Sequence, residues 1–393
     1  MPTKRVSNII SVYMAISPAL AMYLFLPGAE LAKFIALVFA IYSLFKYGSK
    51  GYSRETFKLF LAVIVITVIS YFYHTMIHAS WFNSSHVVSN ILSSAFTFAP
   101  IVLLSSYINP KLFIKAGIYL GIIASLFVIW QRFMGILTGS FPTDFFLPWF
   151  EINRDIETFS KDRPSAFFTE PAHFCIFLLP VVYTTLLYKN FLLSAFFSFA
   201  ILCSGSTTGF LMIVILLVIH IIENKSSHKW RNILLLLFGS GVLYYLLMVF
   251  FPQIILENLD KVEGVQEGNS DMRLLGPLDY FWIFDEFEQF FGITLNQLED
   301  FGKARLNLYE MKNFSNGALF MLLSYGFIGF FFLLLFIIRL WKRCPSTKGY
   351  LAVFMGILCS DQILFNCHFM YLVLVVLCSE QFYTYINSVH SNK

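Results

Sequence analysis

Residues 191–222 read FLLSAFFSFAILCSGSTTGFLMIVILLVIHII, an apolar run whose main break is a group of small polar residues at its centre. A helix needs roughly 17–25 residues to cross the hydrocarbon core of a bilayer, so the run is too long for one upright span and short for two. The central SGSTTG at 204–209 has the composition of a turn. We therefore predict two spans, 191–204 and 207–222, joined by a turn at 205–206.

The whole chain has the composition of a membrane protein. Of its 393 residues, 58% are hydrophobic and only 13% are charged, whereas an ordinary soluble domain carries about 25% charged residues. We expect one integral membrane domain, 1–393, with an all-α polytopic fold of about 12 transmembrane helices. The predicted spans are 8–26, 31–47, 57–77, 88–108, 112–132, 166–188, 191–204, 207–222, 232–251, 317–340, 350–365 and 369–388.

The distribution of basic residues assigns the two sides of the membrane. With both termini cytoplasmic, 17 of the 27 basic residues fall in short inner segments, and the short outer connections carry none, as the positive-inside rule requires. A single span over 191–222 would instead move Lys225, Lys229 and Arg231 to the outer face. Charge therefore favours the division into two spans.

Two long polar loops, 133–165 and 252–315, then fall on the same outer face. They and their edges hold 18 of the 23 acidic residues, which makes this face acidic and excludes a general polyanion-binding surface such as one for nucleic acid. In the second loop, apolar residues recur at roughly helical spacing over 278–291, after Pro277 and before Gly292.

We predict an amphipathic helix over 278–291 that lies on the outer membrane interface or covers the spans. Its acidic residues Asp279, Asp285, Glu286 and Glu288 are expected to face water. Arg273 comes just before this helix, and an arginine beside a helix N-terminus is a favourable place for a phosphate group.

A second arginine lies where the first loop enters a span, in Arg163-Pro-Ser-Ala-Phe-Phe-Thr-Glu170-Pro171-Ala-His-Phe174. Charges at such a boundary are costly and point to function. Two fixed guanidinium groups, Arg163 and Arg273, could stabilise a pyrophosphate leaving group without a metal. Glu170 could accept the proton of an attacking hydroxyl. The residues thus suggest an outer site for a lipid-linked, phosphate-bearing substrate.

Four stretches, in order, resemble the Wzy-type O-antigen polymerases of the O-antigen polymerase and ligase superfamily. They cover most of the chain from the fifth predicted span onward, although Thr207 stands where the family often has an arginine. The stretches are the Arg163–Pro171 segment, the turn at 204–209, Arg273 and Gly292 with eighteen residues between them, and Asn316-Gly-Ala-Leu with Tyr325-Gly326-Phe-Ile-Gly329.

The resemblance implies a GT-C-like architecture and a glycosyltransferase of the bacterial inner membrane, active on its periplasmic face. Such enzymes transfer a growing glycan from undecaprenyl pyrophosphate to the next undecaprenyl-pyrophosphate-linked repeat unit. With this reaction, Arg163, Arg273 and Glu170 are the expected catalytic residues, and Asn316 joins the two arginines as a pyrophosphate ligand. Arg305, an outer basic residue that could simply be solvated, is a reserve ligand. The expected partners are these lipid-linked glycans and membrane lipids, with a chain-length regulator as a further candidate, and no cofactor or metal is expected.

Each assignment has a structural alternative. Arg163 could extend from a span end to the interface, Arg273 could pair with an acidic neighbour such as Asp271 or Asp279, and Glu170 could simply favour a helix start. Asp361 could make a packed polar contact with Gln362 and Asn366, and Gly326 and Gly329 could allow close helix packing. His74, His78 and His86 have spacing that could suit a metal, but no nearby acid or cysteine in the sequence completes a site.

Two other functions remain open. An O-antigen ligase often has His-Asn where this chain has Ser315-Asn316, and together with Glu170-Pro171 this difference favours a polymerase. A lipid-linked-sugar flippase would also need many spans, but transporters usually show internal repeats, and the halves of this chain show no clear similarity.

Overall fold

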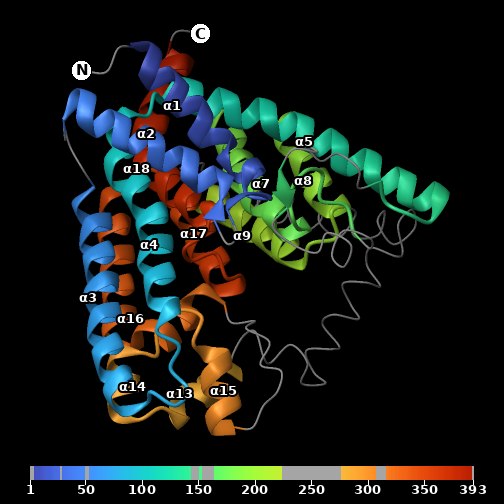
Figure 1. Ribbon diagram of the computed structural model, residues 1–393. Coiled ribbons are helices and arrows are strands. Elements are labelled where there is room, and N and C mark those ends of the chain that lie inside the picture. Colours follow the sequence, from blue (N-terminus) through green and yellow to red (C-terminus); the bar gives the residue numbers. More distant parts are fainter. Residues whose placement is uncertain are drawn as a thin grey trace.

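The computed structural model describes residues 4–26, 29–48, 53–142, 150–152, 163–223, 276–306 and 316–391 (Figure 1). Helices dominate this part of the chain. They are α1 (Lys4–Ile16), α2 (Leu31–Tyr47), α3 (Arg54–Ile77), α4 (Ser85–Leu104), α5 (Pro110–Thr138), α7 (Pro171–Leu187), α8 (Phe191–Cys203), α9 (Thr207–Glu223), α13 (Gly276–Ile283), α14 (Glu286–Phe291), α15 (Leu298–Leu306), α16 (Gly317–Arg343), α17 (Lys348–Ser360) and α18 (Cys367–Ser391), with 3₁₀ turns η1 (Ser17–Leu20) and η2 (Ser105–Tyr107).

Five of the described helices are long and apolar enough to cross a membrane: α3, α4 with η2, α5, α16 and α18. Helices α7, α8, α9 and α17 are apolar but shorter. A helix of 13 residues, such as α8 or α17, is about 20 Å long and does not by itself cover a hydrocarbon core of about 30 Å. The helical, membrane-type fold is therefore confirmed, whereas the count of twelve spans remains a prediction and span 232–251 lies outside the described residues.

The division of 191–222 agrees with the structure. Helix α8 ends at Cys203 and α9 begins at Thr207, and Gly205 between them has a φ of 66°. This left-handed conformation is readily available only to glycine. The turn brings α9 back along α7, where a Cβ on Gly209 would lie 2.5 Å from Cys175 Sγ. The small residues at 204–209 thus serve both the reversal and the close packing.

The first predicted span, 8–26, is wrong in its second half. Helix α1 stops at Ile16, since Pro18 has no N–H to continue the helix, and η1 follows. The chain then forms strand β1 (Tyr23–Leu26), which pairs antiparallel with β2 (Ala29–Glu30) and with β3 (Glu151–Ile152). This small sheet attaches the first predicted loop to the N-terminal region. Most of the rest of that loop lies outside the described residues, although α5 extends six residues into it beyond the predicted end at 132.

The predicted amphipathic helix over 278–291 is two short helices. Asp285 interrupts it and forms a capping box with Glu288: each side chain accepts a hydrogen bond from the other residue's backbone N–H. The expectation that Glu288 faces water is wrong, because its side chain is fully buried. Trp282 and Phe290 are 68% and 54% exposed, and apolar exposure of this size suits the predicted contact with a membrane interface.

The end of α14 and the residues that follow it in the second loop contact α16 through backbone atoms. Gly326 interrupts α16 with a φ of 62° and ψ of −168°. Ile293 N and Thr294 N donate to the carbonyls of Leu323 and Ser324, at 3.2 and 2.9 Å. Gly292, whose φ of 71° ends α14 as predicted, lies so close that a Cβ would be 2.3 Å from the Ser324 carbonyl carbon.

The chain ends and the helices of the second loop lie at opposite ends of the molecule. The two chain ends lie close together, and α13, α14 and α15 lie at the opposite end of the long helices α3, α4 and α16 (Figure 1). Helix α18 runs through the interior, and 72% of its most apolar window is buried. Side chains of α7, α17 and α18 supply much of the largest core cluster, so these three helices form the centre of the packing.

Candidate functional site

The segment before α7 is not helical. Glu170 is extended, with φ −146° and ψ 154°, because the residue before a proline avoids helical geometry. Helix α7 therefore begins at Pro171, not at the predicted 166. Pro164, Ser165 and Ala166 are buried. Arg163 at the start of the segment is partly exposed and forms no ion pair with the residues that the structure describes.

Two adjacent polar residues of α5 bond to this segment and to the end of α8, and the sequence analysis missed both. Gln131 Oε1 accepts a hydrogen bond from Ala166 N at 2.7 Å, which fixes the positive φ of 54° at Ala166. Arg132 is 3% exposed, and its Nε donates to the carbonyl of Cys203 at 2.8 Å. The end of α5 thus connects the Arg163 segment with the turn between α8 and α9. The signal in the sequence was an adjacent Gln-Arg pair at the end of an apolar run.

The first turn of α7 contacts the first turn of α18. The rings of His173 and His368 stack with centroids 4.2 Å apart and an interplanar angle of 23°. Nδ1 of His173 also forms a hydrogen bond with the Thr169 hydroxyl. His368 is 1% exposed. Glu170 is partly buried one turn before His173, so a carboxylate and an imidazole occur together at this helix start.

The connection between α17 and α18 is a buried non-helical segment. Asn366 caps α18 through hydrogen bonds from the backbone N–H groups of His368 and Phe369. Phe365 has a φ of 66°, and its carbonyl accepts from Lys33 Nζ at 2.8 Å and from Thr97 at 3.0 Å. Lys33, 6% exposed, is a second buried cation that the sequence analysis missed.

Asp361 and Asn316 have structural contacts here. Oδ1 of Asp361 accepts from the Gln362 N–H, and its carbonyl accepts from Gly317 N at 3.0 Å. Oδ1 of Asn316 accepts from Leu319 N at 3.0 Å, which makes Asn316 the N-cap of α16. The Asp361 side chain thus bonds to the neighbouring backbone, while its carbonyl makes the contact with α16, and Asn316 uses its side-chain oxygen in the cap. The predicted side-chain contact with Asn366 stays a prediction.

A second polar cluster lies where the second loop meets α3. Arg305 Nη1 is 3.0 Å from Glu288 Oε2, and Arg305 Nη2 is 3.8 Å from Asp285 Oδ2. His78 Nε2 lies 3.2 Å from Asp285 Oδ2, which also accepts from the Tyr73 hydroxyl at 3.0 Å. Arg305, predicted as a phosphate ligand, thus already has two carboxylate partners.

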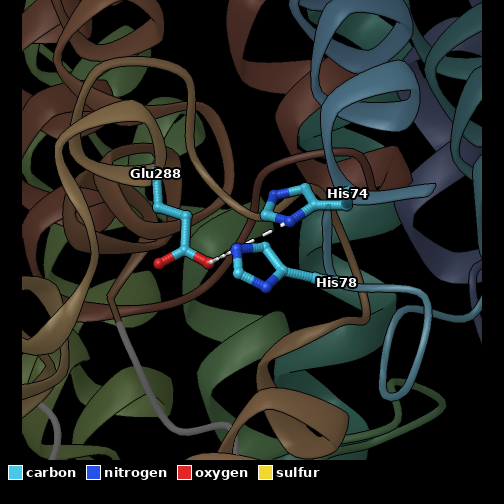
Figure 2. Close-up of side chains that lie close together, drawn as sticks. All are labelled: His74, His78 and Glu288. Atoms are coloured by element: carbon cyan, nitrogen blue, oxygen red, sulfur yellow. Dashed lines mark ion pairs between the residues drawn. The ribbon is translucent and has the colours of Figure 1, made fainter. Parts of the chain in front are cut away.

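The two carboxyl groups of this cluster differ in acidity. Burial raises the pKa of Glu288 above its ordinary value, although hydrogen bonds and the Arg305 charge oppose this. Burial also acts to raise the pKa of Asp285, but hydrogen bonds from the Glu288 backbone, His78 and Tyr73 hold it below its ordinary value. Glu288 completes a set with His74 and His78 (Figure 2), so the expectation that no acid accompanies these histidines is wrong.

Arg273 lies outside the described residues, so its position relative to Arg163 stays a prediction. His86, also considered as a ligand, does not belong to the set formed by His74, His78 and Glu288. A search against models of protein families and a search of curated proteins both found no match to this chain.

Proposed function

We propose that this protein is a glycosyltransferase that polymerises lipid-linked oligosaccharide repeat units at the outer face of a bacterial inner membrane. The growing glycan moves from undecaprenyl pyrophosphate to a hydroxyl of the next lipid-linked repeat. The bond between the anomeric carbon and the pyrophosphate oxygen breaks, a glycosidic bond forms, and the acceptor proton passes to a base. The termini would then be cytoplasmic, and the second loop periplasmic.

One observation carries this proposal: stretches that resemble the polymerases, although far apart in sequence, are linked by contacts between the helices that they begin or end. Gln131 and Arg132 of α5 bond to Ala166 and to Cys203. Cys175 Sγ of α7 lies 3.4 Å from Ser204 Oγ in the turn at 204–209. Its helix α7 meets α18 through the two stacked histidines. The start of α16, at Gly317, bonds to the carbonyl of Asp361, the C-cap residue of α17.

The electrostatics of this region suit an anionic leaving group. Helices α7, α16 and α18 all begin here, and a helix N-terminus carries a partial positive charge. Side chains cap α16 and α18, whereas no side chain of the described residues caps α7. Arg163 adds a full charge at the entry of α7. A guanidinium can hold a pyrophosphate through two parallel hydrogen bonds, so charge that develops on the leaving group is stabilised as the sugar bond breaks.

The proton of the acceptor hydroxyl needs a base near this position. Glu170 is the proposed base, because it lies at the start of α7 and is only partly buried. A carboxylate there would sit within one turn of the bound anion and could accept the proton directly or through one water. Arg273 is proposed to complete the anion site from the second loop.

The test is the glycan profile of a strain in which the chromosomal gene is replaced by variants. Arg163→Ala, Arg163→Lys and Glu170→Gln should leave the protein in the membrane but abolish long glycan chains, with single repeats retained. Lys33 and Arg132 are structural and are left unchanged. Lys303→Ala is the matched control, because Lys303 is an exposed cation of the second loop that pairs only with Glu299 among the described residues.

The outcome separates the candidate functions. A normal ladder of chain lengths in Arg163→Ala and in Arg163→Lys would contradict the proposed role of the arginine. If a strain without the protein accumulates polymer on the carrier lipid, the protein is a ligase. If repeat units stay on the cytoplasmic side in that strain, it is a flippase.

A further inference from the structure

Three side chains converge between α3 and the second loop. His74 lies in the last turn of α3, His78 caps its end, and Glu288 lies on α14, so that both rings and the carboxylate point toward one another (Figure 2). Glu288 Oε1 is 4.0 Å from His74 Nδ1 and 3.7 Å from His78 Nε2. The three atoms lie within 4.8 Å of one another.

Two of these atoms, His74 Nδ1 and Glu288 Oε1, are buried without hydrogen-bond partners, whereas His78 Nε2 already contacts Asp285 and Arg305. The side chains of His74 and Glu288 are 0% exposed, and neither His74 ring nitrogen nor Glu288 Oε1 has a hydrogen-bond partner. The Gly292 backbone lies beside the His74 ring, but no hydrogen bond of normal geometry forms. Buried polar atoms are nearly always satisfied in folded proteins, so the unpaired His74 ring and the unpaired Glu288 oxygen that faces it require an explanation.

We propose that His74, His78 and Glu288 bind one divalent transition-metal ion, and that this ion fixes α14 of the second loop on α3. Two imidazoles and one carboxylate are a ligand set that suits Zn²⁺ best and also admits Co²⁺ or Ni²⁺. Ligand atoms around a tetrahedral zinc ion are about 3.3 Å apart. A contraction of roughly 0.5–1.5 Å therefore converts the present spacing into a coordination shell.

The surroundings of Glu288 hold it in the orientation that such a site needs. Its Oε2 accepts from Asp285 N at 2.8 Å and from Arg305 at 3.0 Å, and these bonds leave Oε1 directed at the histidines. Partners that orient a ligand through its other atoms are a regular feature of metal sites. Asp285 Oδ2, 3.2 Å from His78 Nε2, offers a further oxygen near the site.

Arg305 has to move when a metal ion binds at this site. Its Nη2 lies 3.1 Å from His78 Nε2, so the guanidinium must turn away from this nitrogen when a metal binds, while Nη1 keeps its bond to Glu288. The Arg305 side chain is 25% exposed and has room to do so. The inference does not depend on the proposed transferase activity, because it needs no substrate.

The experiment uses the full chain, purified in detergent, stripped with a chelator and then equilibrated with Zn²⁺ or Co²⁺. We expect one ion per chain by elemental analysis, and an absorption spectrum of bound Co²⁺ typical of nitrogen and oxygen ligands. Metal should raise the melting temperature, because an ion that binds only the folded state stabilises it. It should also slow proteolysis within 276–306.

Matched variants assign the ligands. His74→Asn and Glu288→Gln should reduce Zn²⁺ affinity at least tenfold and remove the thermal shift, whereas His86→Ala, a histidine outside the cluster, should change neither. Gel filtration of each variant without metal verifies that it is folded. A wild-type protein that binds no ion, or variants at positions 74 and 288 that bind as well as the wild type, would overturn the proposal. The first result would mean that Arg305 is the only cation of the cluster.

Discussion

The contact between Gly292 and Gly326 gives the sharpest test of how the second loop is held. We consider Gly326→Ala. Gly326 has φ 62° and ψ −168°, a region of backbone space that is essentially restricted to glycine. A Cβ at this position would lie 2.3 Å from the carbonyl carbon and oxygen of Phe290. Because those atoms are backbone, no side-chain rotation can relieve the overlap.

The expected cost has three parts. An alanine in this conformation costs about 1–3 kcal/mol, and overpacking against a rigid neighbour costs about 1–3 kcal/mol. Displacement of α14 also weakens the hydrogen bonds from Ile293 and Thr294 to α16, at about 1 kcal/mol each. Together the loss is roughly 4–8 kcal/mol. At an unfolding entropy of about 0.8 kcal/mol per kelvin for 393 residues, the melting temperature falls by about 5–10 °C.

The assay is thermal unfolding of purified protein in one detergent. Gly139→Ala is the matched control, because Gly139 also has a positive φ, 72°, but a Cβ there meets nothing within 4 Å. Its conformational cost alone is about 1–2 kcal/mol, equivalent to about 2 °C. If Gly326→Ala melts within 1–2 °C of the control, the close approach of α14 and α16 does not exist in the protein.

Three further predictions test other contacts. Lys33→Met should destabilise the protein by about 3–5 kcal/mol, because it leaves Glu30 buried without its partner; the double variant with Glu30→Gln should recover part of this in a melting experiment. Asp285→Ala should remove the cap of α14, at about 1 kcal/mol, and speed proteolysis within 276–306. Trp282 is exposed, so brominated lipids in vesicles should quench its fluorescence. A Trp282→Leu variant serves as the blank, and equal quenching of the total fluorescence in both proteins would show that α13 does not touch the membrane.

Hydropathy located most helices, but it did not predict that the second half of the first predicted span forms strand β1. The apolar run 8–26 satisfies a spanning pattern, and the pattern carries no information on the hydrogen bonds that β1 forms with Glu151 and Ile152, more than a hundred residues away. In contrast, the turn at 205–206 was predictable, since its glycine and serines act locally. Structure that depends on neighbouring residues could therefore be predicted from the sequence, and strand pairing over long sequence distances could not.

The treatment of Glu288 shows a different kind of error. Helical periodicity over 278–291 was real, but a continuous helix was the wrong interpretation, because Asp285 followed three residues later by Glu288 is itself a helix-start pattern. That pattern was present in the sequence. The meeting of Glu288 with His74 was not, because it depends on how the loop folds back on α3. The candidate site at α7 was found only in part, since Arg163 and Glu170 stood out as charges whereas His173 and its partner His368 did not.

The first half of α16 links the two polar regions. At its start, Gly317 N bonds to the Asp361 carbonyl beside the α17–α18 connection. At the Gly326 break, the carbonyls of Leu323 and Ser324 receive the N–H groups that follow α14. The segment from Gly317 to Ser324 is therefore bonded to the end of α17 on one side and to the second loop on the other. It lies between the metal site that we propose and the connection that leads into α18, whose His368 stacks on His173 at the start of α7.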